Sequence, residues 1–276
     1  MIISSFLLFS CFCVIICQTL RGDTMGQYQD KREKKIIIAG SSEVVPNIFE
    51  LEKIGAGHDG YIFRFNDRVL KLLKYDINLR KERNLMTFDK AELFKNSFNL
   101  ERVTQPIDFL LDEDGIYSGY VMNYIEDLTS FRKEGTPRYR QPGDFSCGDL
   151  ISSTEILQSD FSKMSSKDIV VRDINSGSYI FASDFMHLCD MDKYYLGKNA
   201  AYFNKQSLNF VIAKFLYMEM VKTGDFSRED KKLLNRWVAK QSNSQSFLSE
   251  VKSDIGTNYS TSISDYASEK VKTLIR

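Results

Sequence analysis

The sequence contains little cysteine, histidine, proline or tryptophan. Its 276 residues include five cysteines, two histidines, four prolines and one tryptophan. Cys11, Cys13 and Cys17 lie in an apolar N-terminal stretch, which leaves only Cys147 and Cys189 for the rest of the chain. Two isolated cysteines exclude a disulfide framework, and with two histidines they offer no zinc-ligand spacing. We therefore expect the protein body to belong to a reducing compartment.

An excess of charge of either sign is also missing. Lys plus Arg and Asp plus Glu both number 37, so the formal net charge is zero. No overall field favours nucleic acid, and we expect no nucleic-acid partner. Apolar residues make up 43% of the chain and charged residues 27%, which excludes the disordered and fibrous classes and is ordinary for a globular protein.

The N-terminus is an apolar stretch without charge. Residues 1–20 are just long enough to cross a bilayer as a helix, and the basic residues that begin at Arg21 predict a cytoplasmic body by the positive-inside rule. Alternatively Met25 is the true start and residues 1–24 are not translated. We expect a cytoplasmic protein, anchored to a membrane through residues 1–20 if these are translated.

The first half of the body has the pattern of an antiparallel sheet. Short β-branched and aromatic runs fill residues 36–73, with a turn at 65–68. Strong helix formers with spaced apolar residues predict an amphipathic helix over 78–97. A second hairpin follows, with strands at 107–111 and 116–125. The pattern predicts a sheet with one inserted helix.

The second half is predicted to be mainly helical. Residues 129–148 form a basic loop rich in glycine, and helical patterns follow over 149–164 and 206–222. The tail from 228 to 276 is polar and helical in character, with a Ser/Thr-rich stretch at 259–264 that we expect to fray. The two halves together predict an α+β protein.

A Gly-x-Gly-x-x-Gly element spans Gly55–Ile62 between two predicted strands. Glycines there let backbone amides approach phosphates closely, and the strand on either side argues against a dinucleotide-binding turn, which opens a helix. Val69-Leu70-Lys71 follows at the end of a strand. A plain glycine-rich hairpin and an ordinary exposed lysine are the alternatives that these two features leave open.

Three further segments complete an ordered set. Tyr120–Glu126 is the last strand of the first half, Ile169–Ile180 contains Arg172-Asp173, and Leu188–Asp192 contains Asp190-Met191-Asp192, which begins 17 residues after Asp173. A lone turn aspartate is usually structural, but five elements in this order and spacing are not coincidental. Together they resemble the protein-kinase-like superfamily, in an atypical, small, bacterial-type form.

The resemblance implies a bilobal fold and a site for ATP with Mg²⁺ or Mn²⁺. Residues 25–47 would be a leader, 48–128 a small antiparallel β lobe with one helix, and 129–276 a mainly helical large lobe. Lys71 would pair with the ATP phosphates and with Glu82, Asp173 would accept the proton of the acceptor hydroxyl, and Asp190 would hold the metal. The nucleotide would also contact Gly55, Gly57, Gly60, Ile62, Val69, Met122, Tyr124 and Ile180.

The sequence departs from the family pattern in the large lobe. Ser178 stands where the second metal ligand is usually Asn, and Asp192 replaces a glycine and adds a carboxylate that could serve as a metal ligand instead. Few residues separate Asp192 from the helix at Gln206, so the activation segment is shortened. Three functions stay open: phosphotransfer to a protein Ser or Thr, phosphotransfer to a small molecule, and a pseudokinase that binds nucleotide or scaffolds a regulatory partner.

Overall fold

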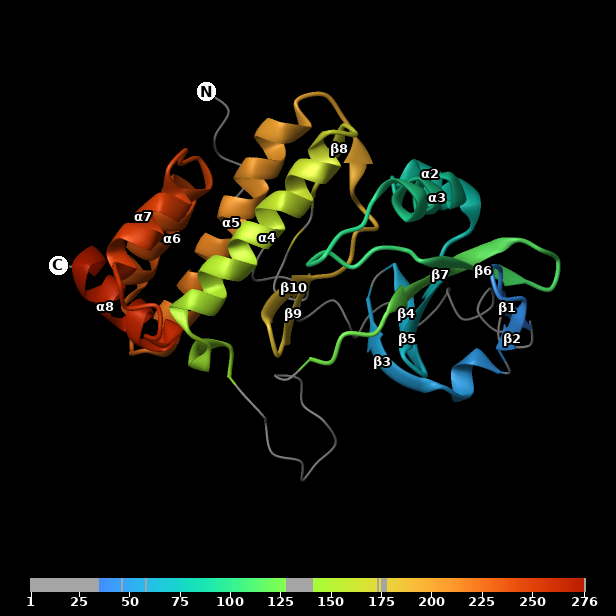
Figure 1. The fold of residues 1–276 in the computed structure, drawn as a ribbon, viewed down its shortest axis with the longest axis horizontal. Coiled ribbons are helices and arrows are strands. Elements are labelled where there is room, and N and C mark those ends of the chain that lie inside the picture. The colour runs from blue at the N-terminus through green and yellow to red at the C-terminus, as the bar shows by residue number, and fades with distance from the viewer. Residues whose placement is uncertain are drawn as a thin grey trace.

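The computed structural model describes residues 35–45, 47–57, 59–127, 141–172, 174 and 178–275. Over these residues the chain is an α+β protein, with an antiparallel sheet at one end and long helices at the other (Figure 1). The predicted anchor at 1–20 and most of the basic loop lie outside the described residues. None of the helices within the described part of the chain is long and apolar enough to cross a membrane.

Seven strands form one sheet in the order β2-β1-β6-β7-β5-β4-β3, with every neighbouring pair antiparallel. The strands are β1 (Ile36–Ile38), β2 (Glu43–Val45), β3 (Glu52–Ala56), β4 (Gly60–Phe65), β5 (Arg68–Leu73), β6 (Asp108–Asp112) and β7 (Tyr117–Asn123). Both predicted hairpins are present. They turn at Asn66 and Gly115, whose φ angles of 58° and 76° are left-handed and suit these residue types.

The sheet begins earlier than the expected boundary at residue 48. Strand β1 pairs with β6, and β2 pairs with β1, so the end of the predicted leader 25–47 belongs to the sheet. Ile38 and Val45 are fully buried there. These apolar strands cover an edge of the sheet that would otherwise expose unpaired backbone groups, which is why they do not act as a linker.

Strand β5 lies inside the sheet, and its side chains alternate between two cores. Leu70 and Leu72 pack with the smaller cluster on one face, whereas Val69 and Leu73 pack with the main cluster on the other. Alternation places Lys71 on the same face as Val69 and Leu73. The lysine therefore points toward the helical part of the molecule.

The predicted helix 78–97 is two helices, α2 (Ile77–Glu82) and α3 (Phe88–Ser97). Asn84 between them has a left-handed φ of 54°, which ends α2, and the Thr87 side chain accepts a hydrogen bond from the Lys90 amide and caps α3. The expectation of one continuous helix is therefore wrong. The break changes which side chains of this segment face the sheet.

Long helices form the other end of the molecule. They are α4 (Cys147–Ser165), α5 (Ala200–Lys222), α6 (Arg228–Ser242), α7 (Phe247–Ile255) and α8 (Ile263–Ile275), and the short 3-10 turns are η2 (Ile48–Glu50) and η3 (Pro142–Asp144). In Figure 1, α4 and α5 lie nearer the sheet than α6 to α8. Two small antiparallel pairs accompany α4 and α5: β8 (Ile169–Val170) with β11 (Tyr195–Leu196), and β9 (Tyr179–Ala182) with β10 (Phe185–Leu188).

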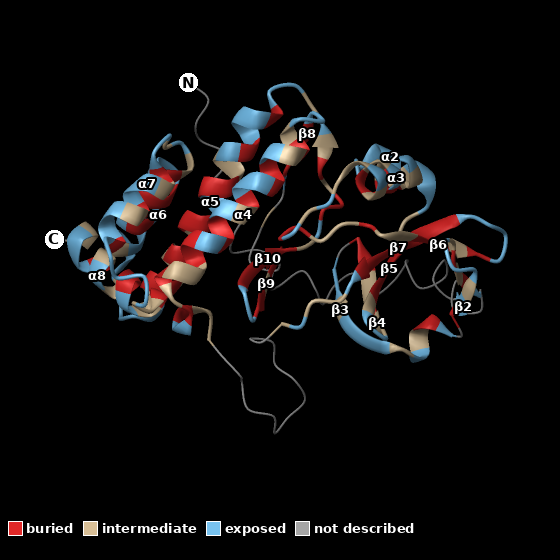
Figure 2. Cartoon of the chain, in the orientation of Figure 1, coloured by how far each residue is buried: buried red, intermediate tan, exposed pale blue. Residues whose placement is uncertain are grey.

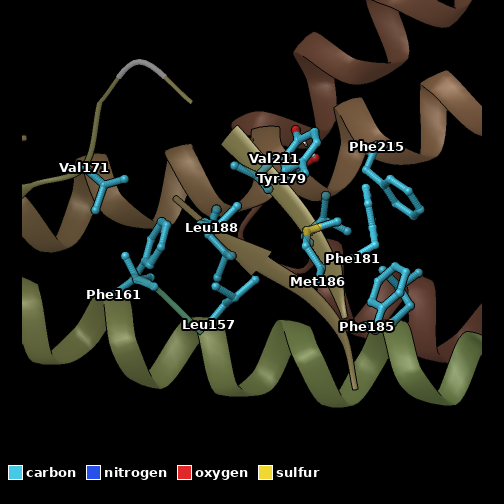
Figure 3. Packing of buried hydrophobic residues seen from close by; sticks show 14 of the residues in the cluster. Leu157, Phe161, Val171, Tyr179, Phe181, Phe185, Met186, Leu188, Val211 and Phe215 are labelled. Carbon is cyan, nitrogen blue, oxygen red and sulfur yellow. Dashed lines mark hydrogen bonds between the residues drawn. The ribbon is translucent and has the colours of Figure 1, made fainter. Parts of the chain in front are cut away.

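The larger of the two apolar cores runs from the sheet into the helices. Figure 2 shows buried residues in both parts of the molecule. In Figure 3, Leu157 of α4 and Phe215 of α5 lie on either side of the β9–β10 hairpin. The rings of Phe181 and Phe185 in that hairpin lie 5.5 and 5.4 Å from the ring of Phe215. This packing fixes β9 and β10, and with them the chain that leads to Asp190.

The stretch at 259–264, expected to fray, is hydrogen-bonded to the start of α4. The amides of Cys147 and Gly148 donate to the carbonyls of Thr261 and Tyr259, each at 2.8 Å. The Ile263 amide donates to the Phe145 carbonyl at 2.9 Å. The polar composition of this stretch misled the prediction, because its backbone finds partners far away in the sequence.

Candidate functional site

A buried ion cluster joins the sheet to the helical part. The Lys71 ammonium lies 2.7 Å from Asp190 Oδ1 and 2.6 Å from Asp192 Oδ2, and its side chain is only 6% exposed. Tyr120 lies opposite Lys71 on β7, and its hydroxyl donates to Asp192 Oδ1 at 2.7 Å. The structure thus brings together three residues that the sequence places in the site, Lys71, Asp190 and Asp192.

The three charged groups differ in their pKa shifts. Burial alone would lower the pKa of Lys71, but the Asp192 and Asp190 carboxylates outweigh it and raise the pKa. Burial alone would raise the pKa of Asp192, but Lys71 and the Tyr120 hydroxyl hold it below its usual value. For Asp190, burial outweighs Lys71 and raises the pKa. Lys71 is therefore a fixed cation at neutral pH.

The two aspartates also differ in exposure. The Asp192 side chain is 1% exposed, whereas the Asp190 side chain is 44% exposed, and Asp190 has a left-handed φ of 70°. Asp192 Oδ1 accepts from the Tyr120 hydroxyl, whereas Oδ2 forms an ion pair with Lys71 and has no hydrogen-bond partner in the described part of the chain. The prediction of Asp192 as a metal ligand does not fit its surroundings, because its carboxylate is buried and its negative charge is paired with Lys71. Asp190 keeps accessible carboxylate surface.

Helix α3 contributes a cation to this cluster. Lys90 Nζ donates to the Asp192 carbonyl at 2.6 Å and to the Asn84 carbonyl at 3.2 Å. Burial lowers the pKa of Lys90 to about 8. Glu82, the predicted partner of Lys71, is exposed at the last residue of α2. That pairing is wrong, because α2 ends there and α3 is the helix that reaches the cluster.

The glycine-rich turn lies between β3 and β4. A Cβ atom at Gly60 would come within 2.9 Å of the Leu72 carbonyl, so only glycine fits there without a shift. At Gly57 an added Cβ would meet no atom within 4 Å. The Gly57 amide donates to the Gly60 carbonyl, and Gly55 lies in β3 against Ile62. The turn therefore has open space on the side of Gly57.

The residues expected to hold the adenine lie on or next to four strands, β4, β5, β7 and β9. Val69 and Met122 are register partners on β5 and β7, and both are buried. Ile62 on β4 and Ile180 on β9 are half-buried. Tyr124 stacks under the Arg64 guanidinium at 4.1 Å, and its amide donates to the Asp67 carbonyl.

The segment before Asp173 is fixed by α5. Asn204 Oδ1 accepts from the Val171 amide at 2.7 Å, and Asn204 Nδ2 donates to the Ile169 carbonyl at 2.8 Å. Asp173 itself lies outside the described residues. Ser178 is buried, and its carbonyl accepts from the Cys189 amide at 2.8 Å.

Two members of the cluster were missed at the sequence level. Tyr120 carries a detectable signal, since it is two residues before Met122 and therefore shares its face of β7. Lys90 carries none, because its role depends on the break between α2 and α3.

Within the described residues no group of three or more His, Cys, Asp or Glu side chains is arranged to hold a metal ion. No family model matches the chain, and no curated protein is significantly similar to it.

Proposed function

We propose that the protein is a kinase-like phosphotransferase that binds ATP with Mg²⁺ or Mn²⁺ between its sheet and its helical part, which would be the two lobes of the kinase-like fold. The observation that carries this proposal is the Lys71 ammonium, buried at the junction and paired with the half-exposed Asp190. A buried lysine beside one accessible carboxylate, next to an open glycine-rich turn, suits the phosphates and the metal of a nucleotide.

The residues have distinct roles in this proposal. Lys71 would bind phosphate oxygens, and the open space at Gly57 would admit them to the turn. Asp190 would hold the metal ion, which would neutralise charge on the phosphates. Asp173 would accept the proton of an acceptor hydroxyl as its oxygen bonds to the γ-phosphorus and ADP leaves. The acceptor class is a protein Ser or Thr, with a small molecule as the variant.

The first test is the thermal stability of residues 25–276 with ATP and Mg²⁺ or Mn²⁺. Ligand binding raises apparent stability by mass action, by about 2.7 kcal/mol at a concentration ~100 times the dissociation constant. We expect a metal-dependent rise in Tm that Lys71→Ala and Asp190→Asn both abolish. No rise at millimolar ATP would refute nucleotide binding. The absence of both autophosphorylation and transfer of labelled phosphate to any candidate acceptor, with Asp173→Ala behaving identically, would refute phosphotransfer.

A pseudokinase is the second candidate, and one observation favours it. The Lys71 ammonium already has two carboxylate partners, Asp190 and Asp192, so a phosphate group would have to compete with them for the lysine. In a pseudokinase this closed cluster would serve as a structural clamp in a module that regulates a partner. Metal-dependent nucleotide binding without transfer of labelled phosphate, to the protein itself or to an acceptor, would establish this candidate over the first.

A further inference from the structure

Because Glu82 is exposed, another residue must orient Lys71. Two carboxylates lie within 3 Å of the ammonium, at 2.7 Å for Asp190 and 2.6 Å for Asp192. Only Asp192 is itself held in place. Its Oδ1 receives the Tyr120 hydroxyl, and its carbonyl receives Lys90 Nζ.

The surroundings make Asp192 a rigid point and Asp190 an adjustable one. Asp192 is 1% exposed and is linked to β7 and to α3 through Tyr120 and Lys90. The Tyr194 amide donates to the Met191 carbonyl at 3.1 Å, which closes a turn around Asp192. Asp190, by contrast, is 44% exposed and is free to exchange its lysine for another cation.

We propose that Asp192 is the positioning residue for Lys71: it holds the ammonium in place while Asp190 is released to the metal. This inference rests on the proposed function and deepens it, because it separates two carboxylates that lie two positions apart into one that orients and one that binds. The carboxylate that orients the lysine then comes from the same segment as the metal ligand. Movement of α2 would leave the lysine in place, whereas movement of α3 would reach it through Lys90.

A double-mutant cycle tests the pairing without any nucleotide. Tm is measured for Lys71→Met, Asp192→Asn and the double variant, and again with Glu82→Gln in place of Asp192→Asn. We expect the Tm losses of Lys71→Met and Asp192→Asn to be strongly non-additive, because each removes the same contact. The losses with Glu82→Gln should add. Additive losses for Asp192, or non-additive losses for Glu82, would overturn the proposal.

Tyr120→Phe keeps the test decisive if Asp192→Asn does not fold. The variant removes only the hydroxyl that fixes Asp192, so its Tm loss should also be non-additive with Lys71→Met. Additivity in this second cycle would count against Asp192 as the anchor. The Tyr120 hydroxyl donates to Asp192, and the Tyr120 ring, 5.9 Å from the Lys71 ammonium, is kept in Tyr120→Phe.

Nucleotide affinity then separates this inference from the proposed function. By titration calorimetry we expect Asp192→Asn to weaken MgATP binding about tenfold, Tyr120→Phe to weaken it less, and Glu82→Gln to leave it unchanged. Unchanged affinity in Asp192→Asn would refute a positioning role even if the cycle shows coupling. A wild-type protein that binds no nucleotide would refute the proposed function, while the cycle would still decide which residue holds Lys71.

Discussion

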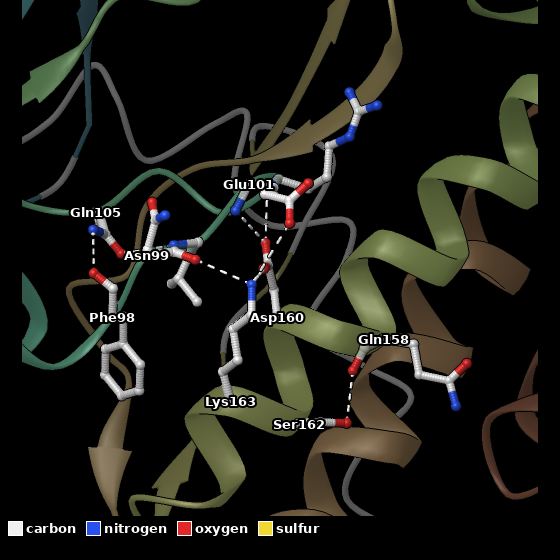
Figure 4. A network of polar contacts seen from close by, with 10 residues as sticks. Phe98, Asn99, Glu101, Gln105, Gln158, Asp160, Ser162 and Lys163 are labelled. Atoms are coloured by element: carbon white, nitrogen blue, oxygen red, sulfur yellow. Dashed lines mark hydrogen bonds and ion pairs between the residues drawn. The ribbon is translucent and has the colours of Figure 1, made fainter.

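Asp160 and Asp192 are two fully buried carboxylates that each join distant parts of the chain, and they do so with different partners. Asp160 Oδ2 accepts from the backbone amides of Glu101 and Arg102 at 2.9 and 2.7 Å, and Lys163 donates to Oδ1 at 3.2 Å (Figure 4). The carboxylate of Asp192 instead contacts two side chains, those of Lys71 and Tyr120.

The difference in partners suits a structural role for Asp160 and a candidate reactive centre around Asp192. Asp160 joins the loop after α3 to α4, because Oδ2 accepts from two backbone amides of that loop. Lys163 donates to Oδ1, so both carboxylate oxygens are used within the protein and neither is left for a ligand. The Lys71 cluster has a second carboxylate, that of Asp190, which is partly exposed and has its pKa raised by burial. Uneven exposure and opposite pKa shifts in one cluster are typical of functional sites.

Removal of Asp160 is expected to have the largest effect on stability. Asp160→Ala would leave the amides of Glu101 and Arg102 without this acceptor, at a cost of about 3 kcal/mol in the free energy of unfolding. Chemical denaturation measures this loss. Asp160→Asn is the matched control, since its carbonyl oxygen still accepts, and it should lose clearly less. Equal losses in the two variants would mean that charge, and not the amide acceptor, is what matters at this position.

Tyr120→Phe is expected to have an intermediate effect, because it removes one hydrogen bond to a buried carboxylate. We expect a loss of about 1.5 kcal/mol in the free energy of unfolding. Tyr117→Phe on the same strand is the control, since the buried Tyr117 hydroxyl has no hydrogen-bond partner in the described part of the chain. That variant should be neutral or stabilising. A Tyr117 loss as large as the Tyr120 loss would show that removal of a buried hydroxyl, and not of its hydrogen bond to Asp192, accounts for the effect.

The sequence alone predicts the α+β class, both hairpins and the positions of α4 and α5. These follow from local turn residues and from apolar periodicity, which act within a few residues. The break at Asn84 was not predicted, because strong helix formers on both sides hide a single left-handed residue. The pinned stretch at 259–264 was not predicted either, since its partners at the start of α4 are more than a hundred residues away.

The same limit applies to the candidate site. Motif spacing identifies Lys71 and Asp190, which the structure brings within 2.7 Å of each other. It cannot tell which of several nearby carboxylates orients the lysine, because that depends on how α2 and α3 pack. Glu82 was chosen for its place in a continuous helix, and the helix is not continuous. The kinase-like lobes and the nucleotide stay predictions.

The smallest expected effect is a pH dependence at a third junction, next to the loop that Asp160 holds. The buried His187 ring lies 2.8 Å from Arg102 Nη1 and 2.8 Å from Asp184 Oδ1 through the same nitrogen. Burial lowers the pKa of His187, and this outweighs the opposing effect of Asp184. The unfolded chain therefore binds more protons than the folded chain as the pH falls through about 6.5.

Stability contributed by a neutral His187 is present above that pH and lost below it. We expect the wild-type Tm to fall between pH 7.5 and pH 5.5 by more than the Tm of His187→Gln, which cannot titrate there. Asp184 acts in the same direction but at more acidic pH, since His187 and Arg102 outweigh burial and lower its pKa from an ordinary value near 4. Parallel Tm curves for the two proteins over this range would show that His187 is not buried in its neutral form. The pH dependence of stability would then come from the carboxylates alone.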